Sequence, residues 1–266
     1  MRRLLRWTCL VVGCGANEPV MRSDDPLAQC RRDASACAAL CPTATACLEL
    51  AGAHADDRGE AQDLELAARL YEHACDAGLG AGCTELAILR EPEDPTGTRR
   101  LHARGCAADD PTACRNSGVA MQRGVGAPPD AAAAAIAYGR ACELGDGPGC
   151  TFLANLLDEG EGVPRDGARA LVHFELACDR GDAQGCHNAG TKLRDGRDVA
   201  VDRRRALDRS DRGCALGSGA ACFDAALDYG RSDAVVPDRA RAEQRVREAC
   251  ELGFEPACAL ARAAGR

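Results

Sequence analysis

The sequence predicts an all-α solenoid of about eight disulfide-clamped helical hairpins, and three observations lead to this fold. Aromatic residues make up only 3% of the 266 residues, and no stretch alternates apolar and polar residues for long, which disfavours strands. The pair Cys-x7-Cys occurs six times, and from Cys106 onward it recurs every 36 residues. Aspartate, alanine and glycine recur in the same register, which is typical of a repeat array.

Residues 1–13 are interpreted as an export signal. They combine an arginine-rich start with an apolar run that is too short for a transmembrane helix. The run ends in Val-Val-Gly before Cys14, which resembles the bacterial lipoprotein signal, in which this cysteine becomes the lipid-modified first residue. An ordinary signal peptide cut nearby is the alternative. Residues 14–26 contain two prolines and no apolar periodicity, so we expect a tether between the lipid and the first repeat.

The number of cysteines agrees with export. Of the 18 cysteines, Cys9 would be lost with the signal and Cys14 would carry lipid, which leaves an even number for disulfides. Disulfides suit the oxidising periplasm or the cell exterior. Zinc is the alternative use, but zinc sites favour closer pairs that converge on one ion, whereas each regular pair here is wider and complete in itself. No metal or other cofactor is therefore predicted.

Residues 27–62 are expected to hold degenerate repeats. Cys47 lies 36 residues before Cys83 and is followed by a similar apolar pattern, so it takes the second-cysteine position of a repeat. Cys41 is its expected partner across a shortened turn, and Cys30 and Cys37 would form an earlier pair. The pairing of these four cysteines stays open, because Cys37 and Cys41 also lie one helical turn apart.

Residues 63–266 are expected to form regular repeats of about 36 residues. In one of them, Asp166 can cap a helix whose apolar residues share one face as far as Cys178. Gly181 then supplies a left-handed helix stop, and a second helix begins near Cys186. We expect one disulfide across the turn of each hairpin, in the pairs Cys75 and Cys83, Cys106 and Cys114, Cys142 and Cys150, Cys178 and Cys186, Cys214 and Cys222, and Cys250 and Cys258.

One repeat is shorter than the others. The stretch from Cys83 to Asp94 has five residues fewer than its equivalents, and Pro92 and Pro95 lie in it or next to it. Proline cannot continue a helix without losing a backbone hydrogen bond. We therefore expect a truncated second helix at this point.

The unit from Gly160 to Cys186, with its Gly-x-Gly-Val-x-x-Asp start and its two cysteines, resembles the Sel-one-like repeat, a relative of the tetratricopeptide repeat. The cysteine register resembles the exported, cysteine-rich Hcp-type branch of that family, over about residues 30 to 264. Ser210 and Val246 depart from the pattern, because other copies have an aromatic residue there. The resemblance implies a right-handed superhelix whose first helices line a concave face and bind proteins or peptides.

Some cysteine-rich members of that family are described as penicillin-binding or β-lactamase proteins, so a β-lactam-binding or hydrolysing protein is an alternative. A serine β-lactamase needs Ser-x-x-Lys, and no serine in the chain has a lysine three positions later. The five histidines are too dispersed for a metallo-lactamase motif. The sequence thus favours a protein that is not an enzyme, and it identifies no catalytic residue.

The sequence places a partner-binding surface only coarsely. The net charge of −8 argues against nucleic acid. Arg104, Arg140 and Arg212 recur on one face of successive first helices, and they are expected to contact acidic groups of a partner if that face is concave and exposed. Ordinary solvated side chains are the alternative. We expect a lipid-anchored scaffold of the bacterial cell envelope, periplasmic or at the outer membrane, with a protein or peptide on its concave face. A purely structural spacer is the remaining alternative.

Overall fold

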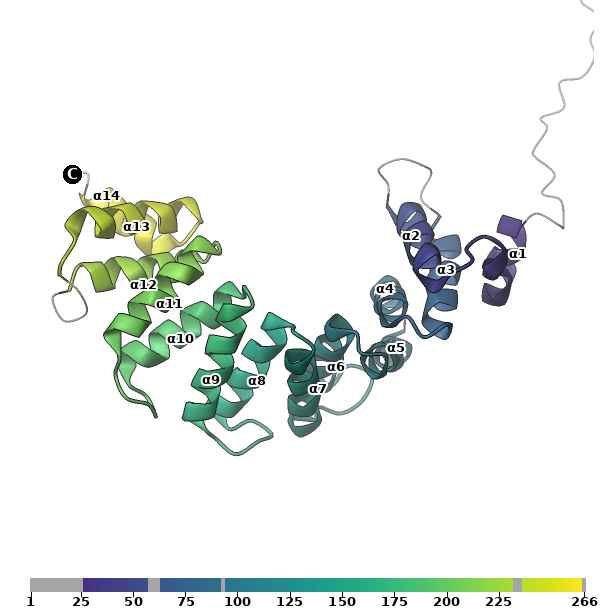
Figure 1. The fold of residues 1–266 in the computed structure, drawn as a ribbon, viewed down its shortest axis with the longest axis horizontal. Coiled ribbons are helices and arrows are strands. Elements are labelled where there is room, and N and C mark those ends of the chain that lie inside the picture. The colour runs from purple at the N-terminus through teal and green to yellow at the C-terminus, as the bar shows by residue number, and fades with distance from the viewer. Residues whose placement is uncertain (1–25, 57–62, 92–93, 232–235, 265–266) are drawn as a thin grey trace, which may run out of the picture.

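The computed structural model describes residues 26–56, 63–91, 94–231 and 236–264 (Figure 1). In these ranges the chain is helical and contains no strand. The expected signal peptide, Cys14 and nearly all of the expected tether lie outside the described residues. The elements are α1 (Pro26–Arg32), η1 (Ala34–Ala39), α2 (Ala44–Ala55), α3 (Leu64–Asp76), α4 (Gly80–Arg90), α5 (Pro95–Ala107), α6 (Pro111–Arg123), α7 (Ala131–Glu143), α8 (Gly147–Glu159), α9 (Gly167–Asp179), α10 (Ala183–Asp195), α11 (Arg203–Ala215), α12 (Gly219–Tyr229), α13 (Arg239–Glu251) and α14 (Glu255–Ala264).

Aspartate side chains cap the first helix of each regular hairpin, as the sequence predicts. Asp166 Oδ1 accepts a hydrogen bond of 2.9 Å from the backbone N–H of Arg169 at the start of α9. Such a cap contributes about 1 kcal/mol to helix stability. Several second helices are capped as well, a feature that the sequence analysis missed. The capping residues of these second helices are Asp110, Asp146, Asp182 and Ser218.

Within the described residues eight disulfides clamp the helices, and six of them join the Cys-x7-Cys pairs that the spacing predicts. The Cα atoms of each pair lie between 4.3 and 5.1 Å apart. Cys30 pairs with Cys37, and Cys41 with Cys47, which gives the connectivity of the four irregular cysteines. The turns inside the clamps use left-handed backbone, with Gly145 at φ 102° and, in the one copy without glycine, Asp109 at φ 58°.

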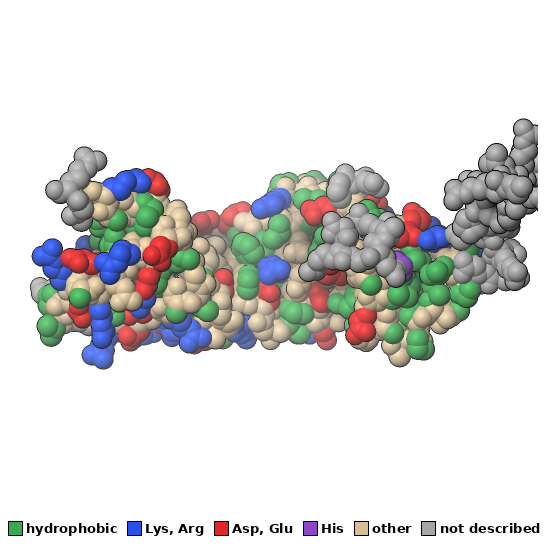
Figure 2. Space-filling view, turned by 90° about the horizontal axis from the view of Figure 1, so that it is seen from above, with side chains coloured by type: hydrophobic (Ala, Val, Ile, Leu, Met, Phe, Trp, Pro, Cys, Tyr) green, Lys and Arg blue, Asp and Glu red, His purple; other side chains and the backbone are tan. Residues whose placement is uncertain are grey.

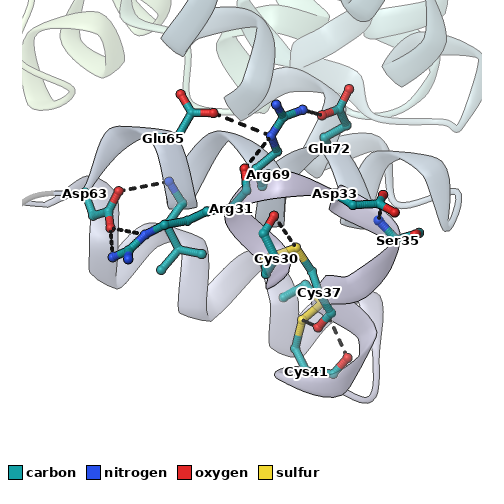
Figure 3. Close-up of a disulfide and its surroundings, with 12 residues drawn as sticks. Cys30, Arg31, Asp33, Ser35, Cys37, Cys41, Asp63, Glu65, Arg69 and Glu72 are labelled. Carbon is teal, nitrogen blue, oxygen red and sulfur yellow. Dashed lines mark hydrogen bonds and ion pairs between the residues drawn. A yellow bond between two sulfur atoms is a disulfide. The ribbon is translucent and has the colours of Figure 1, made fainter. Parts of the chain in front are cut away.

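The irregular N-terminal repeats pack directly onto α3 (Figure 3). Arg31, at the end of α1, donates from Nε to Oδ2 of Asp63 at 3.0 Å, and Asp63 also caps α3. Arg69 of α3 donates back to the carbonyl oxygen of Arg31 at 3.3 Å. Their shared core contains the four irregular cysteines together with Leu66, Leu70 and Tyr71. These repeats are therefore part of the array.

The truncated helix is also found where the sequence predicts it. α4 has 11 residues and ends at Arg90, whereas α6, α8 and α10 each have 13. α12, in a repeat of full length, also has 11. The next helix begins only five residues later, with Pro95 in its first turn. The shorter period of this repeat is thus absorbed by one helix and its connection.

The hairpins stack into an arc whose inner face is formed by the even-numbered helices (Figure 1). Each even-numbered helix from α2 to α10 contacts the next even-numbered one, whereas among the odd-numbered helices from α3 to α13 only α9 and α11 approach comparably. The inner side of a curved array is the shorter side, so its helices lie closer together. This corrects the expectation that the first helix of each hairpin, which is odd-numbered, lines the concave face.

Candidate binding site on the inner face

The three arginines singled out in the sequence lie in the odd-numbered layer and connect neighbouring repeats. Arg104 Nη2 lies 2.8 Å from Asp76 Oδ1, and Arg140 Nη2 lies 2.6 Å from Asp109 Oδ1. Arg212 donates to the carbonyl oxygen of Cys178 at 3.1 Å. Each thus reaches the end of the preceding odd-numbered helix, where the helix dipole favours a cation. The structure does not bring the three together, and their contact with a partner stays a prediction.

The inner face carries carboxamide side chains on three successive even-numbered helices, a feature that the sequence analysis missed. They are Asn116 on α6, Asn155 on α8 and Asn188 on α10. Asn188 Nδ2 donates to Asn155 Oδ1 at 3.3 Å, and Asn188 Oδ1 accepts from Gln184 at 2.7 Å. Within the described residues, Nδ2 of Asn155 and the carboxamide of Asn116 have no hydrogen-bond partner.

Asn155 and Asn188 line an open cavity of about 210 Å³ between α8 and α10. Its floor is the buried ring of Phe174 of α9, and Thr191 is part of its wall. Lys192, the only lysine of the chain, also lines it; its side chain is 4% exposed and is paired with Asp158. We call the space between two successive even-numbered helices, above the aromatic position of the intervening odd-numbered helix, a niche. This is the α8/α10 niche.

An equivalent cavity of about 120 Å³ lies two repeats earlier, in the α4/α6 niche. Asn116 takes the position in this niche that Asn188 takes in the α8/α10 niche, and Asn188 lies 72 residues later in the sequence. His102 takes the floor position of Phe174. Burial lowers the pKa of His102, so its imidazole is neutral at pH 7, and its Nδ1 has no hydrogen-bond partner among the described residues. Glu91 and Arg123 also line this niche.

The α6/α8 niche, between these two, is closed by aromatic side chains. Phe152 of α8 occupies the position equivalent to Asn116 and Asn188, and its ring stacks on Tyr138 with centroids 5.0 Å apart. Tyr138 donates to Gln122 Oε1 at 2.9 Å. Glycine at position 118 makes room for the ring, because a Cβ there would lie 2.5 Å from it.

The α10/α12 niche is closed by charged side chains. Its floor residue is the small, buried Ser210, and Arg194 of α10 fills the space above it. Arg194 Nη2 lies 2.8 Å from Oδ2 of Asp228, whose side chain is 1% exposed, and Nη1 lies 3.3 Å from Asp224 Oδ2. Nδ1 of His187 lies 3.0 Å from the same Asp224 oxygen, off the direction of a hydrogen bond. Two carboxylates thus hold one buried guanidinium.

Electrostatics stabilises the charged forms in this niche. Burial raises the pKa of Asp224, but the contact with His187 and the charge of Arg194 outweigh it, so the pKa lies below its usual value. Burial likewise lowers the pKa of Arg194, but the hydrogen bonds with Asp228 and the charge of Asp224 raise it above its usual value. Both groups are therefore ionised at neutral pH. The open side of the arc as a whole carries acidic and basic side chains interspersed with apolar ones (Figure 2).

The described part of the chain brings potential metal ligands together at one place. Its single group of three potential metal ligands is Cys214, Cys222 and Glu248, and the two cysteines there form a disulfide and are not thiolates. Lys192 makes its ion pairs with Asp158 and Asp198. Among the described helices, none has the length and apolar character needed to cross a membrane. The arrangement is suited to holding a ligand by hydrogen bonds.

The chain is similar to Sel1 repeats over part of its length. The family model of the Sel1 repeat matches residues 44–79, 111–146 and 147–182. The last of these ranges covers α8 and α9, so in this phase each repeat begins with an even-numbered helix, and the disulfide from α7 to α8 joins two repeats. The hairpin predicted from the sequence begins instead at an odd-numbered helix, so it differs from this phase by one helix. No curated protein sequence matches the chain.

Two of the solved structures that the chain resembles show the same fold. A protective antigen present in uropathogenic Escherichia coli strains, which displays an SLR fold, superimposes with a TM-score of 0.75 at 19% identity, covering 84% of this chain and 49% of the antigen. The chain thus spans about half the length of that protein. A Sel1 repeat protein from Oxalobacter formigenes gives 0.69 at 22% identity, covering 79% and 88%. Helicobacter pylori cysteine rich protein B gives 0.42 at 26%, covering 49% and 98%.

Proposed function

Because the chain is a Sel1-like repeat protein, we propose that it is an exported scaffold whose inner face binds a partner protein through an extended peptide segment. The single observation that carries this proposal is the set of carboxamides on α6, α8 and α10. A carboxamide offers one acceptor and two donors, which match the carbonyl and N–H of a peptide unit. Asn116 and Asn155 keep donors that no described residue uses.

The rigidity of the array supports the same function. The hairpins are held by eight disulfides, and consecutive even-numbered helices contact each other. A face that is already ordered loses little conformational entropy on binding, so more of the interaction energy appears as affinity. A row of hydrogen-bonding groups on a rigid support is therefore a suitable surface for a flexible segment.

Export and anchoring complete the proposal. Disulfides of this number persist in an oxidising compartment, which supports a location outside the cytoplasm. We propose that Cys14 carries the lipid and that the scaffold is held at a membrane of the cell envelope, in the periplasm or at the outer membrane. Mass spectrometry of the chain purified from membranes tests the anchor, because Cys14→Ser should abolish the lipid adduct and release the chain into the soluble fraction.

Site-specific photo-crosslinking in intact cells tests the binding face. A photoreactive residue at position 155 or 85 lies on the inner layer, and one at position 172 or 244 lies on the odd-numbered layer. We expect discrete crosslinked species from the inner positions only, because a partner segment must lie within a few ångströms of them. Adducts formed equally from both layers would contradict the inner-face proposal. Absence of adducts from every position would favour a purely structural spacer.

A further inference from the structure

The two open niches are equivalent places in the repeat, separated by one closed niche. The α4/α6 and α8/α10 niches each have a carboxamide at the same position and a ring at the floor. Between them, Phe152 replaces the carboxamide and stacks on Tyr138. Beyond them, Arg194 fills the α10/α12 niche. Of the four niches between α4 and α12, two are therefore open to side chains of a ligand, and these two lie two repeats apart.

We propose that these two niches are paired anchor pockets for one extended peptide segment of a partner, whose two anchor side chains lie about six residues apart in its sequence. The inference rests on the proposed function, and it specifies the partner that the inner face recognises. Contacting helices lie roughly 10 Å apart, so two steps between even-numbered helices span about 20 Å. An extended chain rises about 3.3 Å per residue, and about six residues cover that span.

The charges of the niches define the chemistry of the anchors. In the α8/α10 niche the carboxylates of Asp158 and Asp195 are balanced by Lys192 and Arg197. In the α4/α6 niche Glu91 is balanced by Arg123, and His102 is neutral because burial lowers its pKa. A charged anchor would find no surplus of opposite charge in either niche. The carboxamides favour uncharged side chains that both donate and accept hydrogen bonds, such as those of Gln, Asn, Ser and Thr.

The niches differ in size, which makes the two anchors distinguishable. The α4/α6 cavity is about 120 Å³ and the α8/α10 cavity about 210 Å³. The smaller cavity is matched by a short anchor and the larger by a long one. The recognised segment therefore has an order, with one small and one larger polar anchor, and it binds in a single direction.

Selection from a random peptide display library on the full chain in oxidised form tests the inference. We expect the recovered peptides to carry two enriched uncharged polar positions about six residues apart. Asn116→Phe and Asn188→Phe each close one niche by copying Phe152, and we expect each to weaken a selected peptide about 10-fold or more and to abolish enrichment at one anchor only. Gln244→Phe, which also replaces a carboxamide side chain by phenylalanine but on α13, is the matched control and should leave both anchors unchanged.

The outcomes separate this inference from the proposed function. If a phenylalanine variant does not fold, as judged by its circular dichroism and thermal unfolding, Asn116→Leu or Asn188→Leu replaces it and should have the same effect on its own anchor. Peptides that bind the inner face through one anchor only would overturn the paired pockets but leave the scaffold proposal intact. Peptides that keep both enriched positions in the Asn116 variant and in the Asn188 variant would do the same. Failure to recover any peptide that competes at the inner face overturns both.

Discussion

The α6/α8 and α10/α12 niches are both closed, but opposite kinds of chemistry close them. Tyr138 and Phe152 fill the first with a stacked aromatic pair, and Arg194 with Asp228 and Asp224 fills the second with a buried ionic group. Each of the two niches lies between two successive even-numbered helices and above one odd-numbered helix. The repeat backbone thus accommodates either kind of filling, provided that the floor residue and the residue facing it are complementary in size. The large ring of Tyr138 faces Gly118, and the small Ser210 leaves room for the guanidinium of Arg194.

The two solutions differ in their tolerance of a single substitution. Loss of part of an aromatic pair removes contacts in proportion to the atoms lost. Loss of one partner of a buried ion pair leaves the other charge without compensation, which costs more than the pair contributes. The ionic niche should therefore be the more fragile of the two, although it has more hydrogen bonds.

The largest expected effect is that of Asp228→Leu. Arg194 would keep only Asp224 as a charged partner in the buried niche, and we expect a loss of about 3 kcal/mol in the free energy of unfolding. Urea unfolding of the oxidised protein measures it. Asp195→Leu, at the exposed end of α10, is the control and should change the stability by less than about 0.5 kcal/mol. Equal losses in the two variants would mean that burial of the charge is not the cause.

A second substitution in the same niche should restore most of that loss. In Arg194→Leu combined with Asp228→Leu no unpaired buried charge remains, and apolar side chains take its place. We expect the double variant to unfold within about 1 kcal/mol of the wild type. If it is instead less stable than Asp228→Leu alone, then the hydrogen bond of Arg194 to Ser210 and its pair with Asp224 dominate, and the ionic niche is a net stabilising element.

The aromatic niche should respond less to its matched change. Tyr138→Phe keeps the stacked ring and removes only the hydroxyl that donates to Gln122, so we expect a loss of about 1 kcal/mol. Thermal unfolding compared with that of Asp228→Leu gives the contrast directly. A loss as large as that of the ionic variant would show that the Gln122 contact, and not the ring, holds the α6/α8 niche closed.

Much of this fold follows from the sequence, because its determinants are local. The aspartate caps, the turn glycines and the cysteine pairs all lie within one hairpin, and the Pro-rich connection after Cys83 predicts the short α4. The phase of the repeat, that is, which helix begins each repeat, cannot be predicted from such local features. Both helices of a hairpin carry buried apolar residues, and only contacts between even-numbered helices decide which layer is inside.

The niches escaped prediction for a related reason. Arg194 meets Asp228 across 34 residues, and neither residue type indicates burial by itself. One signal was present: Asn116 and Asn188 occupy the same register two repeats apart, and Ser210 breaks the column of aromatic floor residues. Comparison of the second helices column by column would have found the carboxamides, but not which niches are open, because that depends on how side chains fill a shared space.

The smallest expected effect is a difference in pH dependence between the two closed niches. The pKa of Asp224 is lowered in the fold, so its stabilising contribution is present above pH 4 and is lost as the pH falls through its folded pKa. Burial raises the pKa of Tyr138 to about 12 from an ordinary value of 10.0, so its contribution is intact below pH 10 and is lost as the pH rises toward 12.

Acid should therefore increase amide hydrogen exchange in α10 and α12 first, and alkali should increase it in α6 and α7 first. Asp224→Asn should reduce the acid response and Tyr138→Phe the alkaline one, each leaving the other unchanged. Parallel exchange of all helices at both extremes would show that the niches do not open independently, and that the disulfides couple the repeats into one cooperative unit.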